Sequence, residues 1–286
     1  MTSGFRDRSV SPVSIHFRAE EGAVVDEMRG AGAAQRRARR VLRPVANRLW
    51  SIDVSGLDRL PADGPAILCP NHVSFLDSAF TMLVVPRNIS FVGKAEYMDS
   101  WKTKFLFPMM GMIPIDRSGG EKSRAALDAA ESVLRRGELF GIFPEGTRSR
   151  DGCLYKGRTG AARLATAVGC PIFPVGIVGT ELIQPPDAKA PKLFKSCSIS
   201  IGRAVRPERH VREGMSEGEL HQAWRAMTDE VMFEIREMTG QVYKNVYAGK
   251  STETAVDPNT TGRVAHVGEP EHPIDHKSSG GELVSP

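Results

Sequence analysis

The sequence predicts a single α/β layered domain, and two observations support this fold class. Short apolar runs typical of buried strands alternate with longer segments in which apolar residues recur at helical spacing. The chain has 286 residues, of which 41% are hydrophobic and 25% are charged, so it can bury a sizeable core. We expect the domain to cover residues 51–247.

Six segments are candidate strands. Five of them are mostly apolar, and the last alternates polar and apolar residues as a half-buried strand does. In chain order they are residues 66–69, 89–92, 112–115, 139–143, 172–178 and 198–201.

Two helices are predicted between and after these strands. From Glu121 to Arg136 the apolar residues share one face, and Gly137 follows at the position of a C-cap. From Glu217 to Met238 apolar residues again repeat at helical spacing. Strands that alternate with helices in this way favour a layered sheet.

Neither end of the chain shows such a pattern. Residues 1–33 carry scattered charges, and residues 248–286 are rich in Gly, Pro, Ser, Thr and His, so we expect flexible tails. The first residues hold no apolar stretch of a secretory signal, and no run approaches the ~20 apolar residues that span a bilayer. We therefore expect a cytoplasmic location, with any membrane contact peripheral.

The four cysteines are expected to be reduced core thiols in a cytosolic setting, because they show no C-x-x-C pair and no zinc-type spacing. They are Cys69, Cys153, Cys170 and Cys197. The formal net charge of +4 is too small to indicate nucleic-acid binding, but it suits a protein that visits anionic surfaces.

Residues 34–50 form a basic amphipathic segment ahead of the domain. Its apolar residues lie near one face, arginines fill much of the rest, and Trp50 ends it. Pro44 is expected to kink this helix or to begin a second one. The segment fits a helix lying on an anionic bilayer, and it equally fits a helix packed on the domain with a solvated arginine face. A second apolar patch, Phe105–Met110, fits an acyl-chain groove, a lipid contact or plain core.

His72 is the histidine best placed for chemistry. It follows a buried-looking strand, at a strand-to-helix turn where sites in α/β folds collect. Asp77 comes five residues later, and on a continuous helix this step would rotate the two side chains apart by about 140°. A turn between them can bring the carboxylate to the imidazole, where it would fix the tautomer of a general base. A structural hydrogen bond is the alternative interpretation of such a pair.

A second polar cluster, Phe143–Arg150, directly follows another strand-like run. It contains a carboxylate, a glycine, hydroxyls and two arginines. Arginine forks and exposed backbone N–H groups suit a phosphate, and a carboxylate suits a hydroxyl-bearing polyol. The spacing of a P-loop is absent, and a charged surface turn is the plain alternative. Gly111–Arg117 likewise ends a strand with an arginine that could meet an anion.

Together these segments resemble the four ordered motifs of the glycerolipid acyltransferases, especially the 1-acylglycerol-3-phosphate acyltransferases. Asn71–Asp77 is similar to the first motif, N-H-x-x-x-x-D, and Gly111–Arg117 is similar to the second. Phe143–Arg150 matches the third motif, F-P-E-G-T-R-S-R, and Pro171–Val175 resembles the fourth. The first motif alone is weak, but its combination with the third is specific. The resemblance covers most of residues 51–203.

The resemblance implies transfer of a fatty acyl group from acyl-CoA or acyl-carrier protein to the free hydroxyl of 1-acyl-glycerol-3-phosphate, which gives phosphatidic acid. It also implies a mixed, mostly parallel sheet preceded by a membrane-associating amphipathic element. The expected partners are an anionic membrane surface at the cytoplasmic face, the lysophospholipid acceptor and the acyl donor. No metal and no cofactor are implied, since the acyl donor is a co-substrate.

The resemblance assigns a role to each matching residue. His72 would deprotonate the acceptor hydroxyl, and Asp77 would orient His72. Cationic residues would hold the acceptor's phosphate, while Glu145 and Gly146 would position its glycerol backbone. The implied substrate-binding residues are Lys94, Arg117, Glu145, Gly146, Thr147 and Arg148. The implied acyl-donor side is shaped by Pro171, Ile172, Phe173, Pro174 and Val175.

Three alternatives are left open by the sequence. Within the same mechanism, the acceptor could be another lysophospholipid or a glycolipid. A hydrolase would use Ser74 as its nucleophile beside His72, although the G-x-S-x-G elbow is absent. A non-catalytic peripheral lipid-binding protein would use the basic helix and an apolar groove alone.

Overall fold

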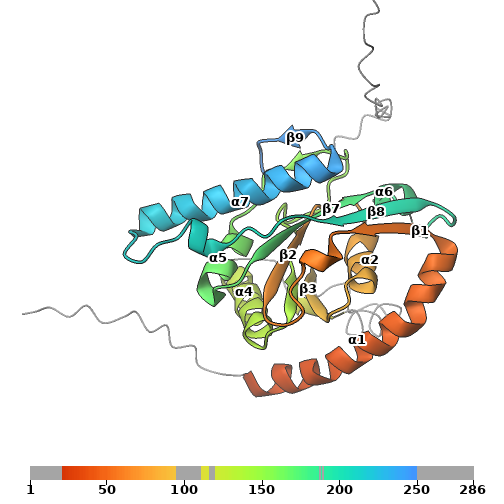
Figure 1. Ribbon diagram of the computed structural model, residues 1–286, viewed down its shortest axis with the longest axis horizontal. Coiled ribbons are helices and arrows are strands. Elements are labelled where there is room, and N and C mark those ends of the chain that lie inside the picture. Colours follow the sequence, from red (N-terminus) through yellow and green to blue (C-terminus); the bar gives the residue numbers. More distant parts are fainter. Residues whose placement is uncertain (1–20, 95–110, 116–119, 187, 189, 250–286) are drawn as a thin grey trace, which may run out of the picture.

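A seven-stranded sheet forms the centre of the molecule, in the order β1-β8-β7-β2-β5-β3-β4 (Figure 1). The computed structural model describes residues 21–94, 111–115, 120–186, 188 and 190–249. All neighbouring strands pair in parallel except β7 and β8, which pair antiparallel. The strands are β1 Ser51–Ser55, β2 Ala66–Pro70, β3 Ile89–Lys94, β4 Met112–Ile115, β5 Leu139–Gly141, β7 Ile172–Val178 and β8 Ser196–Ile201. The predicted mixed, mostly parallel sheet is therefore confirmed.

Helices cover both faces of this sheet and complete a three-layered α/β domain. The helices α4 Gly120–Arg135, α5 Gly160–Val168 and α7 Glu217–Thr239 lie on one face. On the other face lie α1 Glu21–Leu49, α2 Leu76–Val84 and the short α6 Thr180–Ile183. Two 3-10 turns, η1 Leu57–Arg59 and η3 Pro207–Arg209, and a small parallel sheet of β6 Leu154–Tyr155 and β9 Tyr243–Lys244 complete the description.

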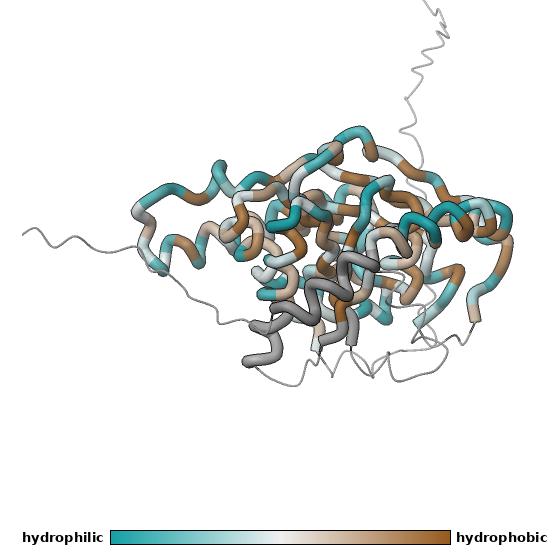
Figure 2. The backbone as a smooth tube through the Cα atoms, turned by 90° about the horizontal axis from the view of Figure 1, so that it is seen from below, coloured by the Kyte–Doolittle hydropathy of each residue, from teal (hydrophilic) through white to brown (hydrophobic). Residues whose placement is uncertain are grey.

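The two cores follow from the period-2 alternation of the central strands. In β2, Ala66 and Leu68 face the layer of α1 and α2, whereas Ile67 and Cys69 face the layer of α4, α5 and α7. All four side chains are fully buried. Figure 2 shows apolar residues mostly toward the middle of the molecule and many hydrophilic residues at its periphery. Two covered faces explain why β2 is an unbroken apolar run.

All six predicted strands are present, and both predicted helices lie within two residues of their expected bounds. Gly137 adopts φ 77° and its N–H donates to Leu134 O, as expected of a residue that ends a helix. β1 was not predicted, because its Ser-Ile-Asp-Val-Ser pattern is that of a half-exposed edge strand. A helix was expected after His72, but no bounds were predicted for α2, α5 or α6, which are too short for helical periodicity to be distinct.

The boundary expected between a tail of residues 1–33 and a helix of residues 34–50 was wrong, because α1 already begins at Glu21. The sequence has no proline between Glu21 and Arg43, so helical hydrogen bonding can start earlier. Pro44 does not break α1 either. Pro44 is exposed, so water can satisfy the carbonyl group that its missing N–H leaves unpaired. Residues 1–20 and 250–286 lie outside the described residues.

α1 packs on the domain through polar contacts that its sequence did not indicate. Arg39 is buried and donates from Nε to Met82 O at 3.0 Å and from Nη1 to Pro86 O at 2.7 Å. Gln35 donates from Nε2 to Ile89 O and accepts from the Ile89 N–H. Carbonyl groups in the last turn of α2, just after it and at the start of β3 therefore accept hydrogen bonds from α1. Burial, with the neighbouring charges of Arg43 and Arg36, lowers the pKa of Arg39.

The face of α1 that packs on the domain is not the apolar face that the sequence indicated. Ala38 and Ala46 are buried, but Val41 is 64% exposed and Val45 is 50% exposed. The packing interpretation of this helix is therefore confirmed, while its outer face is both apolar and basic. No helix among the described residues is long and apolar enough to cross a membrane. The four cysteines are all free, and Cys69, Cys170 and Cys197 are buried.

Candidate active site

Three neighbouring parallel strands bring the polar motifs to one edge of the sheet. β2 pairs in parallel with both β5 and β7, so the carboxyl ends of these strands meet. His72 follows β2, Phe143–Arg150 follows β5, and Thr180 follows β7. These segments, which are far apart in sequence, therefore meet in one site.

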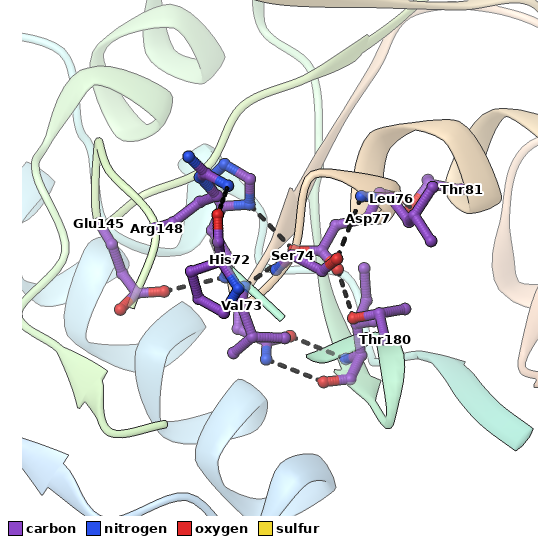
Figure 3. Close-up of polar contacts among 12 residues, drawn as sticks. His72, Val73, Ser74, Leu76, Asp77, Thr81, Glu145, Arg148 and Thr180 are labelled. Atoms are coloured by element: carbon purple, nitrogen blue, oxygen red, sulfur yellow. Dashed lines mark hydrogen bonds and ion pairs between the residues drawn. The ribbon is translucent and has the colours of Figure 1, made fainter. Parts of the chain in front are cut away.

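His72 and Asp77 are in direct contact, as expected from a turn between them. Nδ1 of His72 lies 2.9 Å from Oδ2 of Asp77. Residues 71–75 form the turn, and Asp77 lies in the first turn of α2. Asp77 is fully buried, whereas the His72 side chain is 18% exposed. Figure 3 shows Asp77 between His72 and Thr180, with Glu145 on the other side of His72.

The carboxylate of Asp77 is held by three further donors. Its Oδ2 accepts the backbone N–H groups of Val73 and Ser74, both at 2.8 Å. Its Oδ1 accepts the Thr180 hydroxyl at 2.6 Å. These N–H groups belong to the turn that precedes α2, so the turn itself holds the carboxylate. Asp77 therefore has one defined position.

The contact with Asp77 decides which nitrogen of His72 can act as a base. An ionised carboxylate only accepts hydrogen bonds, so Nδ1 carries the proton and the basic lone pair is on Nε2. The imidazolium formed when Nε2 takes a proton would be stabilised by the buried negative charge. This arrangement fits a general base better than a purely structural hydrogen bond, because part of the imidazole is exposed.

The ring of Phe143 fixes the plane of the His72 imidazole. The two rings stack with centroids 3.7 Å apart and an angle of 15° between planes. Phe91 stacks in turn on Phe143 at 5.5 Å. Gly141 makes this possible, because a Cβ at that position would collide with the Phe91 ring. A stacked face and a bonded Nδ1 together leave the imidazole little rotational freedom.

Both carboxylate oxygens of Glu145 bind the protein backbone. Its Oε1 accepts the His72 N–H at 3.0 Å and its Oε2 accepts the Tyr155 N–H at 2.9 Å. The residue is only 1% exposed. Burial raises the pKa of Glu145 to about 7, although the two N–H donors act in the opposite direction. In the structure Glu145 therefore ties the His72 loop to β6, and its contact with a glycerol backbone stays a prediction.

The residues implied for phosphate binding are only partly described. Arg148 is half-buried and donates from Nη1 to Pro186 O at 3.2 Å. A guanidinium has five N–H donors, so this bond leaves capacity for a phosphate. Gly146, at φ 79°, and Thr147 lie in the same half-buried loop. Lys94 ends β3, but only its backbone is described, and Arg117 and Phe105–Met110 lie outside the described residues.

The fourth motif lies in the core rather than on an open surface. Ile172, Phe173 and Val175 are each at most 3% exposed in the central strand β7. The backbone of this motif is also occupied, since Pro171 O accepts the Ile67 N–H and Pro174 O accepts the Gly202 N–H. The observed role of these five residues is to hold β7 beside β2. A contact with the acyl donor stays a prediction.

Ser74 is not placed as a nucleophile. It is fully buried, its hydroxyl donates to Gln184 O at 2.9 Å, and it accepts the Leu76 N–H. The hydroxyl is thus engaged on both sides, with Gln184 at the end of α6 and with Leu76 in α2. This geometry disfavours the hydrolase alternative.

The residues that join the site to the C-terminal part of the chain were not predicted from the sequence. Asn71 Nδ2 donates to Gln241 Oε1, and Gln241 Nε2 donates to Gly152 O. Lys244 donates to Asp151 Oδ2 at 2.6 Å. Burial alone would raise the pKa of Asp151, but the hydrogen bonds from Lys244 and its other donors hold it well below its usual range. No local pattern marks these residues, because each contact joins segments far apart in sequence.

The described residues hold no group of His, Cys, Asp and Glu that could bind a metal ion. The prediction of a site without metal or cofactor stays a prediction, since part of the chain is not described.

The comparisons with known proteins concern this same region. Residues 51–178 match the family model described as Acyltransferase. A chloroplastic 1-acyl-sn-glycerol-3-phosphate acyltransferase of Brassica napus is 32% identical over 137 residues, which cover 48% of this chain and 40% of the relative. The alpha form of this enzyme in Mus musculus is 29% identical over 164 residues, which cover 56% of this chain and 58% of the relative. The chain thus spans about two fifths of the length of the plant relative.

The fold has a counterpart among solved structures. The crystal structure of PlsC from Thermotoga maritima, a 1-acyl-sn-glycerophosphate acyltransferase, matches with a TM-score of 0.53 and 23% identity. The match covers 74% of this chain and 78% of the other. This likeness supports the layered arrangement around the mixed sheet.

Proposed function

We propose that this chain, whose residues 51–178 match the acyltransferase family model, moves a fatty acyl group from acyl-CoA or acyl-carrier protein to the free hydroxyl of 1-acyl-glycerol-3-phosphate. The observation that carries the proposal is the buried Asp77 carboxylate, 2.9 Å from Nδ1 of a partly exposed His72. The plant and mouse relatives bear the name of this activity.

The reaction follows from the tautomer of His72. Nε2 takes the proton of the acceptor hydroxyl as its oxygen attacks the thioester carbonyl, which forms a tetrahedral intermediate. The intermediate collapses by breaking the carbon–sulfur bond, and the leaving thiolate receives the proton back from the imidazolium. Asp77 stabilises the imidazolium between these steps. The acyl group passes directly to the acceptor, so no covalent enzyme intermediate forms.

Arg148 supports an acceptor that carries a phosphate. It follows β5 in the same loop as Glu145, whose Oε1 binds the backbone of His72. An arginine fork matches phosphate oxygens in a bidentate manner, which would hold the glycerol hydroxyl at a fixed distance from the base. Lys94 and Arg117 would assist Arg148. The product would then be phosphatidic acid.

The outer face of α1 supports a peripheral location at the cytoplasmic face of an anionic membrane. Val41 and Val45 are exposed there, and Arg37, Arg40 and Arg48 are exposed on the same helix. Basic side chains around an apolar stripe are typical of helices that lie in the headgroup region. Such a location would give the site access to a membrane-bound acceptor.

Purified chain with labelled acyl-CoA and a panel of lysophospholipids tests this function. We expect lysophosphatidic acid to be the best acceptor, and we expect His72→Ala to lower the rate by about 10²–10⁴-fold. His210→Ala is a matched control, because His210 forms a second histidine–carboxylate pair, at 2.8 Å to Glu230, away from the site. Full activity of His72→Ala would refute the base assignment, and equal use of uncharged acceptors would refute the phosphate assignment.

A further inference from the structure

A tight loop, Lys192–Lys195, presents two apolar side chains to the surrounding medium. Phe194 is 79% exposed and Leu193 is 47% exposed. Lys192 and Lys195 are also exposed and lie on either side of them. We call Leu193 and Phe194 the apolar tip. An aromatic side chain with so little burial contributes almost nothing to the core.

The backbone conformation of Phe194 is energetically unfavourable. Its φ of 57° makes it the one non-glycine residue with positive φ among the described residues. A bulky side chain is strained in the left-handed region, which glycine or asparagine would occupy more easily. Strain of this kind persists where the surrounding structure enforces it, and it is concentrated at functional positions.

Hydrogen bonds fasten the loop to the end of α1. Phe194 N donates to Leu49 O at 2.8 Å, and Trp50 Nε1 donates to Lys192 O at 2.8 Å. Figure 1 shows the start of β8 beside the C-terminal end of α1, whereas α7 covers the opposite face of the sheet. The tip therefore lies at the end of the helix whose outer face is apolar and basic.

The same segment reaches back to the active site. Gln184 O accepts the hydroxyl of Ser74, and Pro186 O accepts from Arg148. Lys192 N donates to Ile183 O in α6, whose neighbour Leu182 is 61% exposed. Gln184 and Pro186, which contact Ser74 and Arg148, therefore lie only a few residues before the apolar tip in sequence.

The charge around the tip points to an anionic occupant. Residues 188–196 contain lysines and no acidic residue, and residues 34–50 contain arginines and no acidic residue. Phe and Leu between lysines combine apolar burial with attraction to acidic headgroups. A protein partner of opposite charge would have to supply an apolar pocket as well, whereas an anionic bilayer supplies both features.

We propose that Leu193 and Phe194 insert into an anionic lipid bilayer, with Lys192 and Lys195 at its headgroups, as a second membrane contact beside α1. This inference deepens the proposed function, because it places the bilayer next to the turn that carries His72. The strained backbone keeps the Phe194 side chain directed away from the core, so that no rearrangement is needed for insertion.

The change Phe194→Gly separates membrane insertion from folding. Glycine tolerates φ 57°, so the variant should unfold at the same or a higher denaturant concentration than the natural chain. Its affinity for vesicles of phosphatidylglycerol and phosphatidylcholine, measured by co-sedimentation of the full chain, should fall by about tenfold. Phe233→Ala is the matched control, because Phe233 is 56% exposed on α7, and it should bind like the natural chain.

The lysines provide an independent arm of the experiment. Replacing both Lys192 and Lys195 with Ser should weaken binding to anionic vesicles by about fivefold per lysine, and should leave binding to pure phosphatidylcholine unchanged. Equal binding of Phe194→Gly and the natural chain would overturn the proposal. So would loss of self-association in Phe194→Gly without vesicles, since the tip would then contact a second copy.

Binding and turnover distinguish this inference from the proposed function. A chain that binds vesicles through the tip but transfers no acyl group would refute the proposed function alone. On an acceptor with a short, water-soluble acyl chain, Phe194→Gly should keep the natural rate. A loss of rate there would place Phe194 in the catalytic machinery and overturn the membrane assignment.

Discussion

The side-chain amide of Asn71 donates a hydrogen bond to Gln241 Oε1 at 2.9 Å, across 170 positions of sequence. The other end of the Gln241 amide donates to Gly152 O at 2.8 Å. One side chain thus joins the turn that precedes His72 to the loop that follows Glu145. Gln241 lies beyond the residues that match the acyltransferase family model, so the positioning of the site extends past that domain.

The variant Gln241→Ala should lower kcat several-fold with little change in KM. Asn71 keeps its two contacts with Ile177 but loses a fixed partner, so the turn that carries His72 gains freedom. We expect the free energy of unfolding to fall by about 1 kcal/mol, as for one hydrogen bond. Steady-state kinetics and urea unfolding measure the two effects. Gln222→Ala, on the exposed side of α7, is the control, and a Gln241→Ala enzyme with unchanged kcat would contradict the role.

Thr180 offers a test of how the orientation of Asp77 affects the base. Thr180→Val removes only the hydroxyl that donates to Asp77 Oδ1 at 2.6 Å, in a fully buried position. A buried, charged acceptor that loses a donor costs about 1.5–3 kcal/mol of stability. Since the carboxylate then has freedom to rotate, kcat should fall by about tenfold with KM nearly unchanged.

Thr180→Ser is the conservative counterpart, because it keeps the hydroxyl. It should restore most of kcat even though it removes a buried methyl group. If Thr180→Ser lost as much kcat as Thr180→Val, packing rather than the hydrogen bond would explain the defect.

The raised pKa of Glu145 predicts a specific dependence of stability on pH. Its pKa is about 7 in the folded state, because burial outweighs the two N–H donors, against 4.5 for an ordinary Glu. Between these values the folded state binds more protons than the unfolded state, so the contribution of Glu145 to stability falls as pH rises. In the variant Glu145→Gln, the side chain at this position cannot ionise. The free energy of unfolding of the natural chain should therefore decline relative to that of Glu145→Gln between about pH 5 and pH 8.

Urea unfolding of both proteins at several pH values measures this difference, and all other titrating groups are common to the two. Glu237→Gln, at an exposed position of α7, should run parallel to the natural chain. Parallel curves for Glu145→Gln as well would show that the buried carboxyl titrates normally.

The sequence alone predicted the contact of His72 with Asp77 and the central strands, because both depend on local signals. The apolar run of β2 predicts a buried strand. The spacing from His72 to Asp77 fits a turn followed by the first turn of a helix. The resemblance to known motifs then indicated that the loop after β5 belongs beside this turn.

The rest of the site could not be predicted, because it depends on contacts distant in sequence. Nothing in the sequence distinguishes Thr180 and Gln241 from other polar residues. Their contacts with Asp77 and Asn71 form only in the folded chain. No local pattern indicated that the two oxygens of Glu145 bind backbone N–H groups from separate segments. Burial and pairing of this kind are decided by tertiary packing, which no local pattern records.

Arg148 provides the test of acceptor choice. It follows Glu145 in a half-buried loop and donates one hydrogen bond, to Pro186 O at 3.2 Å. A charged hydrogen bond to phosphate is worth about 1.5–3 kcal/mol, so Arg148→Ala should raise KM for lysophosphatidic acid by about tenfold or more. Use of an uncharged monoacylglycerol, however slow, should not change, because that acceptor has no phosphate to lose. Arg203→Ala, at an exposed position after β8, controls for the loss of a positive charge. An equal loss with both acceptors would mean that Arg148 supports the loop through Pro186 rather than binding the phosphate.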